Sequence, residues 1–287
     1  MTVSIMRFGL FLPFLLWTCV SAQDAELRQG NVLSCETYSF RELMMTGKLE
    51  VLAVPEFYKE LGIRGISYND RYFMRTDDRY IDKVKAAVKK AGRVVTCYVI
   101  DGNLASPNEA ERTRQIEADK EKLRVANRLG APVARINVGG PGDNEDPDTV
   151  GVERVVAAFK ELLPLAKELN IKLAIENHGG TSRTADNIVK IIQGTDAKWV
   201  GSLIDFGNFP HDKRYEEIAK LAPYAFATHV KVNRFDAAGE AAEYDFPRVL
   251  GILKGVGYTG PISIEYEGKG DAVEGVRQSK ALIVKHW

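Results

Sequence analysis

The sequence predicts an α/β protein built as a single (β/α)8 barrel, the TIM-barrel fold class. Strand-like and helix-like segments alternate from about residue 32 to the C-terminus, and eight strand-like segments can be counted. Four of these segments, all in the second half of the chain, end in a residue that can bind a metal. No low-complexity linker divides the chain, so we expect one domain.

The eight predicted strands are short runs rich in apolar and β-branched residues. They cover residues 32–35, 64–68, 93–100, 132–138, 172–178, 201–205, 225–229 and 261–265. Alternation of strands with helices indicates a parallel sheet covered by helices, and eight such units favour closure into a barrel. An open doubly wound sheet would need a glycine-rich phosphate-binding sequence after the first strand, and none is present there.

The predicted helices are segments in which apolar residues recur at helical spacing. They cover residues 56–61, 109–129, 152–169, 186–192, 215–221, 246–253 and 273–284. The clearest is 152–169, where Val155, Phe159, Leu162 and Leu169 form one apolar stripe. These segments are expected to form the outer layer of the barrel.

Residues 1–22 are predicted to be a secretion signal and residues 23–287 the barrel domain. Arg7 supplies a positive charge, residues 8–20 are almost wholly apolar, and Ala22 ends a small-x-small cleavage pattern. A membrane span needs about 20 apolar residues, and this run is shorter. A retained signal anchor is the alternative. We expect a periplasmic or secreted protein with no stable membrane span after cleavage.

The charge balance excludes a strong attraction to polyanions. The chain has 39 Lys and Arg against 39 Asp and Glu, so nucleic acid is not an expected partner. Homo-oligomerisation is left open. Cys35 and Cys97 are in apolar strand-like runs and are expected to be buried free thiols.

Four polar residues end the last four predicted strands. They are Glu176, Asp205, His229 and Glu265. Successive members lie roughly 30 residues apart, about one βα unit, and a TIM barrel builds its active site where its strands end. One such residue alone would be read as a helix cap or a solvated loop residue. Four in successive strands instead predict a site for Mn²⁺ or Mg²⁺, with Zn²⁺ or Co²⁺ as alternatives.

Further polar residues near these strand ends are candidates for substrate binding. His178 shares a strand face with Glu176, and Lys231 shares one with His229, where it could stabilise an oxyanion. Asn137 and Asn208 follow the fourth and sixth strands. Solvent-exposed or turn-forming roles are the alternative for all four.

Four motifs resemble those of the xylose isomerase-like TIM-barrel superfamily, in its sugar phosphate isomerase/epimerase branch. They are residues 174–180, 204–209, 228–231 and 264–268. The resemblance implies that Glu176, Asp205, His229 and Glu265 bind one divalent metal, and that the two glutamates act as the acid/base pair. It also implies that the partner is a small-molecule carbohydrate substrate. Ketose 3-epimerases of this superfamily have a substrate-binding histidine where this chain has Asn208. The predicted secretion signal argues against a phosphorylated substrate.

These observations favour a metal-dependent isomerase or epimerase of a non-phosphorylated sugar or oxo-sugar, with Glu176 and Glu265 as catalytic residues on either side of an enediolate. One alternative is a dehydratase or lyase that uses the same metal site on a 3-oxo-sugar or 3-oxo-glycoside. Another is a catalytically inactive secreted sugar-binding protein. The abasic-site endonuclease branch is disfavoured, because the chain has only 4 His and no net charge.

Overall fold

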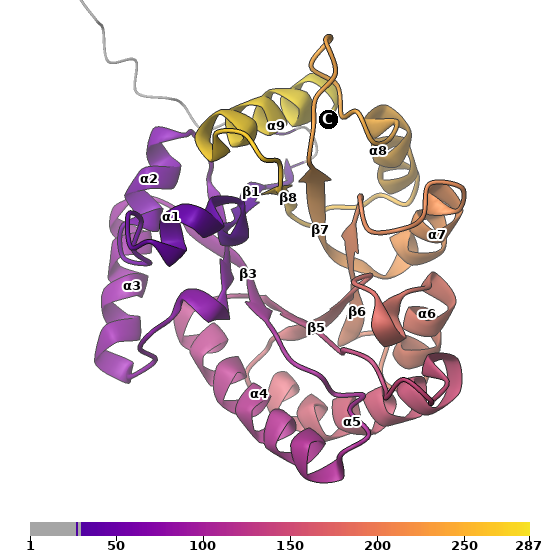
Figure 1. Ribbon diagram of the computed structural model, residues 1–287. Coiled ribbons are helices and arrows are strands. Elements are labelled where there is room, and N and C mark those ends of the chain that lie inside the picture. The colour runs from indigo at the N-terminus through magenta and orange to yellow at the C-terminus, as the bar shows by residue number, and fades with distance from the viewer. Residues whose placement is uncertain (1–26, 28–29) are drawn as a thin grey trace, which may run out of the picture.

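The strands form a closed parallel barrel in which each pairs with its neighbours in sequence, β1 to β8 (Figure 1). The computed structural model describes residue 27 and residues 30–287. The strands are β1 (Leu33–Glu36), β2 (Gly65–Asn69), β3 (Val94–Ile100), β4 (Val133–Ile136), β5 (Lys172–Glu176), β6 (Val200–Asp205), β7 (Ala225–Val232) and β8 (Ile262–Tyr266). The predicted fold class is therefore confirmed. The predicted signal, residues 1–22, lies outside the described residues.

Helices surround the barrel on its outer side (Figure 1). They are α1 (Arg41–Met45), α2 (Val54–Glu60), α3 (Asp78–Lys90), α4 (Glu109–Leu129), α5 (Val152–Glu168), α6 (Ala185–Gln193), α7 (Arg214–Leu221), α8 (Phe246–Gly255) and α9 (Ala272–His286). Short helical turns follow several strands, among them η2 (Thr37–Phe40), η3 (Asp70–Tyr72) and η5 (Gly180–Ser182). None of the helices in the described part of the chain combines the length and apolar character needed to cross a membrane.

Helix α3 was not among the predicted helices. Its buried face consists of Ile81, Val84 and Val88 alone, and charged residues occupy most other positions. These three residues recur at helical spacing, so the amphipathic pattern was present in the sequence and was overlooked. The start of the helix is also well marked, because the side chain of Asp77 accepts a hydrogen bond from Tyr80 N at 3.1 Å as an N-cap.

The two faces of each strand have different surroundings. Outward-facing residues such as Leu173, Ile175 and Ile204 join the large core between strands and helices. A second, smaller apolar cluster consists of Cys97, Val99, Val133, Ala174, Leu203 and Ala227. Because side chains alternate along a strand, this cluster fills the barrel interior, and residues two positions later on β4 to β7 lie above it at the mouth. Cys35 and Cys97 are free and buried, as predicted.

Candidate metal centre

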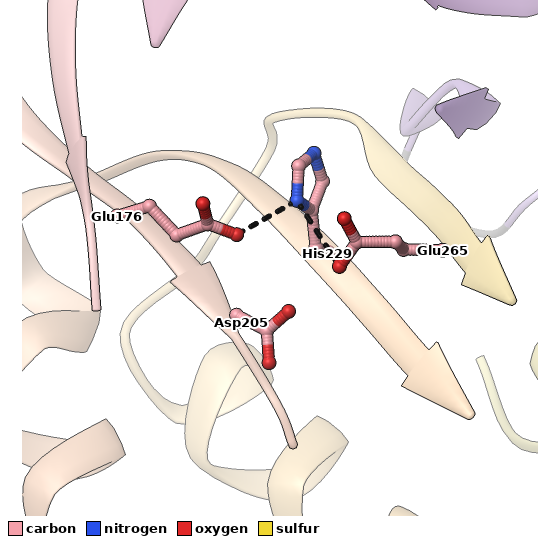
Figure 2. A group of neighbouring side chains, drawn as sticks. All are labelled: Glu176, Asp205, His229 and Glu265. Carbon is pink, nitrogen blue, oxygen red and sulfur yellow. Dashed lines mark hydrogen bonds and ion pairs between the residues drawn. The ribbon is translucent and has the colours of Figure 1, made fainter. Parts of the chain in front are cut away.

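The ends of β5, β6, β7 and β8 bring four buried side chains to one point. They are Glu176, Asp205, His229 and Glu265, and their ligand atoms all lie within 4.8 Å of one another. In Figure 2, Glu176 and Glu265 approach from opposite sides of His229, with Asp205 close to both. The barrel therefore assembles the four residues that the sequence singled out.

His229 faces the carboxylates through one ring nitrogen. Its Nδ1 lies 3.0 Å from Glu176 Oε1 and 3.6 Å from Glu265 Oε2 (Figure 2). Asp205 is held by its own turn, since its Oδ1 accepts hydrogen bonds from the backbone N–H groups of Gly207, at 2.7 Å, and Asn208, at 2.8 Å. The ring nitrogen and the carboxylate oxygens thus converge with fixed orientations.

Asn177 fixes the position of Asp205 from the neighbouring strand. Its amide donates to Asp205 O at 3.0 Å, and its Oδ1 accepts from Asp205 N at 2.8 Å. This pair of hydrogen bonds to the main chain of Asp205 sets the register of the β6 end against the β5 end. The sequence analysis gave Asn177 no role. Its position directly after Glu176 is the feature that could have identified it.

Two oxygens of the cluster are buried without a hydrogen bond from any described residue: Asp205 Oδ2 and Glu265 Oε2. Each has an ion-pair contact with the Lys231 ammonium at 3.3 Å, without hydrogen-bond geometry. A divalent cation would satisfy both oxygens, and a set of three carboxylates and one imidazole suits such an ion. The residues present therefore fit a metal held by Glu176, Asp205, His229 and Glu265.

Arg135 on β4 is a buried cation beside this cluster. Its guanidinium pairs with Glu176 Oε2, and its other terminal nitrogen lies 3.0 Å from Asp101 Oδ1. Arg71, in the turn after β2, pairs with the other oxygen of Asp101. Arg135 was missed from the sequence, although a charged residue two positions after Val133 in an apolar strand was a usable signal.

The electrostatic environment shifts the pKa values of Glu176 and Asp205 in opposite directions. Burial raises the pKa of Glu176, but Arg135 and His229 outweigh it and hold the pKa well below its usual range. Burial raises the pKa of Asp205 well above its usual range, and Lys231 offsets this only in part. For His229, burial lowers the pKa, but Glu265 and Glu176 raise it to about 9. These opposed shifts arise because three carboxylates, an imidazole and the cations Arg135 and Lys231 share one buried volume.

Lys231 lies among the acidic groups at the end of β7. Its Nζ is 2.8 Å from Glu267 Oε1 and 3.3 Å from both Asp205 Oδ2 and Glu265 Oε2. It also donates to Asn208 Oδ1 at 3.0 Å. Burial lowers the pKa of Lys231, but the surrounding carboxylates, Asp205 first, raise it above its usual range. The side chain therefore stays charged.

Glu36, at the end of β1, is a further buried acid near the mouth. Its Oε1 accepts from Asn69 Nδ2 at 3.1 Å, and its Oε2 accepts from Tyr38 N. Burial raises the pKa of Glu36 to about 7, although His229 acts in the opposite direction. The sequence reading overlooked Glu36, but the pattern that found the other four, a polar residue at a strand end, also applies to it.

A cavity of about 460 Å³ opens at the mouth of the barrel. It is lined by Tyr38, Asn69, Arg71, Val99, Asp101, Gly102, Arg135, Asn137, Glu176, His178, His229, Lys231, Glu265 and Glu267. Three of the four candidate substrate-binding residues are therefore at the cavity: Asn137, His178 and Lys231. Asn208 does not line it but contacts Lys231.

A larger hollow of about 770 Å³ lies at the opposite end of the barrel, where residues such as Val94, Pro132 and Pro261 begin or precede their strands. It contains none of the site residues. Because TIM-barrel enzymes place their chemistry at the C-terminal ends of the strands, the smaller cavity at the mouth is the candidate active site.

Comparison with known proteins agrees with this fold. The sequence profile of the family described as "Xylose isomerase-like TIM barrel" matches residues 55–286. The chain belongs to this family. A relative, the uncharacterized protein MJ1311 of Methanocaldococcus jannaschii, is 25% identical over 251 residues, which cover 80% of this chain and 82% of that one.

Solved structures with the same fold include sugar epimerases. Protein SMc04130 of Sinorhizobium meliloti 1021 has a TM-score of 0.71 at 18% identity, with 90% of this chain and 98% of that chain covered. The 3-keto-D-glucoside 4-epimerase YcjR of E. coli has a TM-score of 0.69 at 17% identity, with 82% and 94% covered. At these identities the likeness shows the shared fold.

Proposed function

We propose that this protein is a divalent-metal-dependent isomerase or epimerase of a non-phosphorylated sugar or oxo-sugar. The observation that carries the proposal is the convergence of Glu176, Asp205, His229 and Glu265, with ligand atoms within 4.8 Å of one another, at the floor of a polar cavity. When bound, the metal would polarise the substrate carbonyl and favour formation of an enediolate.

The two glutamates have the placement that proton transfer requires. Glu176 and Glu265 approach the centre from opposite sides (Figure 2), so one can take the proton next to the carbonyl and the other can return a proton on the opposite face. Glu176 is held ionised by Arg135 and His229, which suits a metal ligand. Positioned acid–base transfer contributes typically about 10²–10⁴-fold to the rate.

The charges around the cavity favour a neutral substrate. Its Arg and Lys side chains are already paired: Arg71 with Asp101, Arg135 with Glu176, and Lys231 with Glu267. A phosphate group is normally bound by unpaired cations or a helix N-terminus. Among the residues that line the cavity no Arg or Lys is left unpaired for it, and four of them are carboxylates. The similar E. coli structure is named for an oxo-glucoside, an uncharged substrate of this class.

Elimination at the same site is the second candidate activity, because an enolate can expel a leaving group on the neighbouring carbon. Release of a hydroxyl group would need a general acid in the cavity. The raised pKa of Lys231, set by Asp205 and the other carboxylates against the effect of burial, makes this side chain a hydrogen-bond donor but a poor acid. Lys231 is therefore not the acid of an elimination, and the reaction products distinguish the two reactions.

The decisive experiment is turnover in D₂O. Purified protein loaded with Mn²⁺ would be incubated with aldoses, ketoses and 3-oxo-glycosides, and products would be followed by NMR. Deuterium on the carbon next to the carbonyl, without loss of water or aglycone, is the expected result. An unsaturated product would instead establish a dehydratase or lyase. Sugar binding with neither metal binding nor exchange would establish an inactive binding protein.

Export is part of the same proposal. Arg7, the apolar residues 8–20 and Ala22 support removal of residues 1–22 and a periplasmic or secreted enzyme. A neutral sugar is a reasonable substrate in such a compartment, where phosphorylated intermediates of central metabolism are not expected.

A further inference from the structure

Lys231 contacts the same two oxygens that lack hydrogen bonds in the cluster. Its Nζ lies 3.3 Å from Asp205 Oδ2 and 3.3 Å from Glu265 Oε2. Neither contact has hydrogen-bond geometry, so these are ion-pair contacts in which the ammonium supplies charge without a directed bond. A divalent cation held by the four ligands would draw on these same oxygens.

Lys231 also has a second set of partners farther out. Glu267 Oε1 lies 2.8 Å from its Nζ, and Asn208 Oδ1 accepts a hydrogen bond from it at 3.0 Å. Glu267 and Lys231 both line the mouth cavity. The ammonium is thus shared between an inner pair of oxygens, on Asp205 and Glu265, and an outer pair, on Glu267 and Asn208.

We propose that Lys231 is an internal counter-ion of the metal centre, which competes with the divalent cation for the inner oxygens and is displaced onto the outer pair when the cation binds. The inference rests on the metal-binding part of the proposed function. Its physical basis is charge: an ammonium and a divalent cation a few ångströms apart repel strongly in a buried site.

The outer pair makes the displacement feasible. A lysine has a flexible four-carbon stem, so its head can move by an ångström or two while β7 stays in place. On the outer pair it keeps a carboxylate and an amide oxygen, and its charge is not left uncompensated. Metal binding would then present the ammonium to the cavity, where it can donate to a substrate oxygen.

The test is a calorimetric titration of Mn²⁺ into chelator-treated protein. Lys231→Met should bind Mn²⁺ about tenfold more tightly than wild type, because the competing charge is gone. Arg71→Met is the matched control, since it removes one positive charge from the cavity wall, but that charge pairs with Asp101 outside the cluster. Its Mn²⁺ affinity should change by less than about twofold. An unchanged or weaker affinity in Lys231→Met, or an equal gain in both variants, overturns the proposal.

A second measurement uses the outer partner. Glu267→Gln should weaken Mn²⁺ binding, because Lys231 then relies on the inner oxygens. In the Lys231→Met background the same substitution should have a much smaller effect, and an equal effect in both backgrounds overturns the displacement. Lys231→Gln, which can still hydrogen-bond Asn208, serves as a second variant if the methionine does not fold.

Failure of the metal centre and failure of the role of Lys231 give different results. If Mn²⁺ binds neither wild type nor Lys231→Met, the proposed metal centre and this inference both fail. If wild type binds Mn²⁺ and Asp205→Ala abolishes the binding while Lys231→Met leaves it unchanged, the metal centre stands and only the role of Lys231 is overturned.

Discussion

Glu176 divides its two oxygens between His229 and Arg135: Oε1 lies 3.0 Å from His229 Nδ1, and Oε2 pairs with the Arg135 guanidinium. The carboxylate is thereby fixed in orientation and kept ionised. Glu265 differs, because its Oε2 has no hydrogen bond from a described residue. The two glutamates of the centre are therefore not equivalent, which is a useful property for two proton carriers that act in opposite roles.

The first prediction concerns metal occupancy. Asp205→Ala should lower bound metal and activity together, with partial recovery at high metal concentration, because Asp205 is proposed as a ligand and not as a proton carrier. Elemental analysis of the purified variant measures the occupancy. Asn177→Ala is a second variant to compare. It should also weaken metal binding, but by less than Asp205→Ala, because it only loosens the position of Asp205. Full occupancy in Asp205→Ala would remove this residue from the ligand set.

The second prediction concerns proton transfer. Glu265→Gln is nearly isosteric and retains an amide oxygen that can face a metal, but it cannot accept the substrate proton. Turnover should fall by about 10²–10⁴-fold while some metal is kept. Steady-state kinetics with paired elemental analysis make the measurement. Near-normal turnover would exclude Glu265 as a proton carrier and direct the search to His178.

The third prediction concerns the buried ion pair. Arg135→Met leaves Glu176 buried without its partner, which should reduce the free energy of unfolding by about 3–5 kcal/mol at neutral pH. In wild type, Arg135 and His229 together outweigh burial and lower the pKa of Glu176. The stabilisation is therefore present above the unfolded pKa and is lost as the pH falls through the folded pKa.

The difference between wild type and Arg135→Met should accordingly be largest at neutral pH and shrink below about pH 4.5. Urea unfolding of metal-free protein across this range is the measurement. Arg128→Met serves as the control, because Arg128 pairs with Asp78 and Asp82 at the surface, and its loss should change stability little. A difference that grows as the pH falls would contradict the prediction.

The fourth prediction concerns Glu36. Its pKa is raised by burial to about 7, so the stability that it contributes is present below its unfolded pKa and is lost as the pH rises through 7. Glu36→Gln cannot ionise. Relative to wild type, its free energy of unfolding should increase by about 3 kcal/mol between about pH 5 and about pH 8. Denaturant unfolding with a chelator present tests this, and parallel pH profiles for the two proteins would refute it.

The fifth prediction concerns export. Cleavage after Ala22 gives a mature chain that starts at Gln23. N-terminal sequencing of protein recovered from the native host tests this prediction. Intact Met1 on protein recovered from the cytosol would show that residues 1–22 are not a cleaved signal.

Most of the barrel was accessible from the sequence because its strands are buried on both faces and read as continuous apolar runs. The order of strands and helices followed from that alternation. Helix α3 was overlooked, although Ile81, Val84 and Val88 recur at helical spacing in a segment of mostly charged residues. Arg135 and Glu36 were missed for a different reason. A charge in a strand has no evident partner until the barrel closes and brings Glu176 and Asn69 beside them.

The sequence by itself determined the fold class and four polar strand ends, Glu176, Asp205, His229 and Glu265, because strand period and unit length are local properties of the chain. Only the tertiary structure decided what these side chains contact. It showed that Arg135 pairs with Glu176, that Lys231 is shared by Asp205, Glu265 and Glu267, and that Glu36 is buried beneath the mouth. These contacts join residues on different strands, and their energies depend on distance and burial, which the order of residues does not specify.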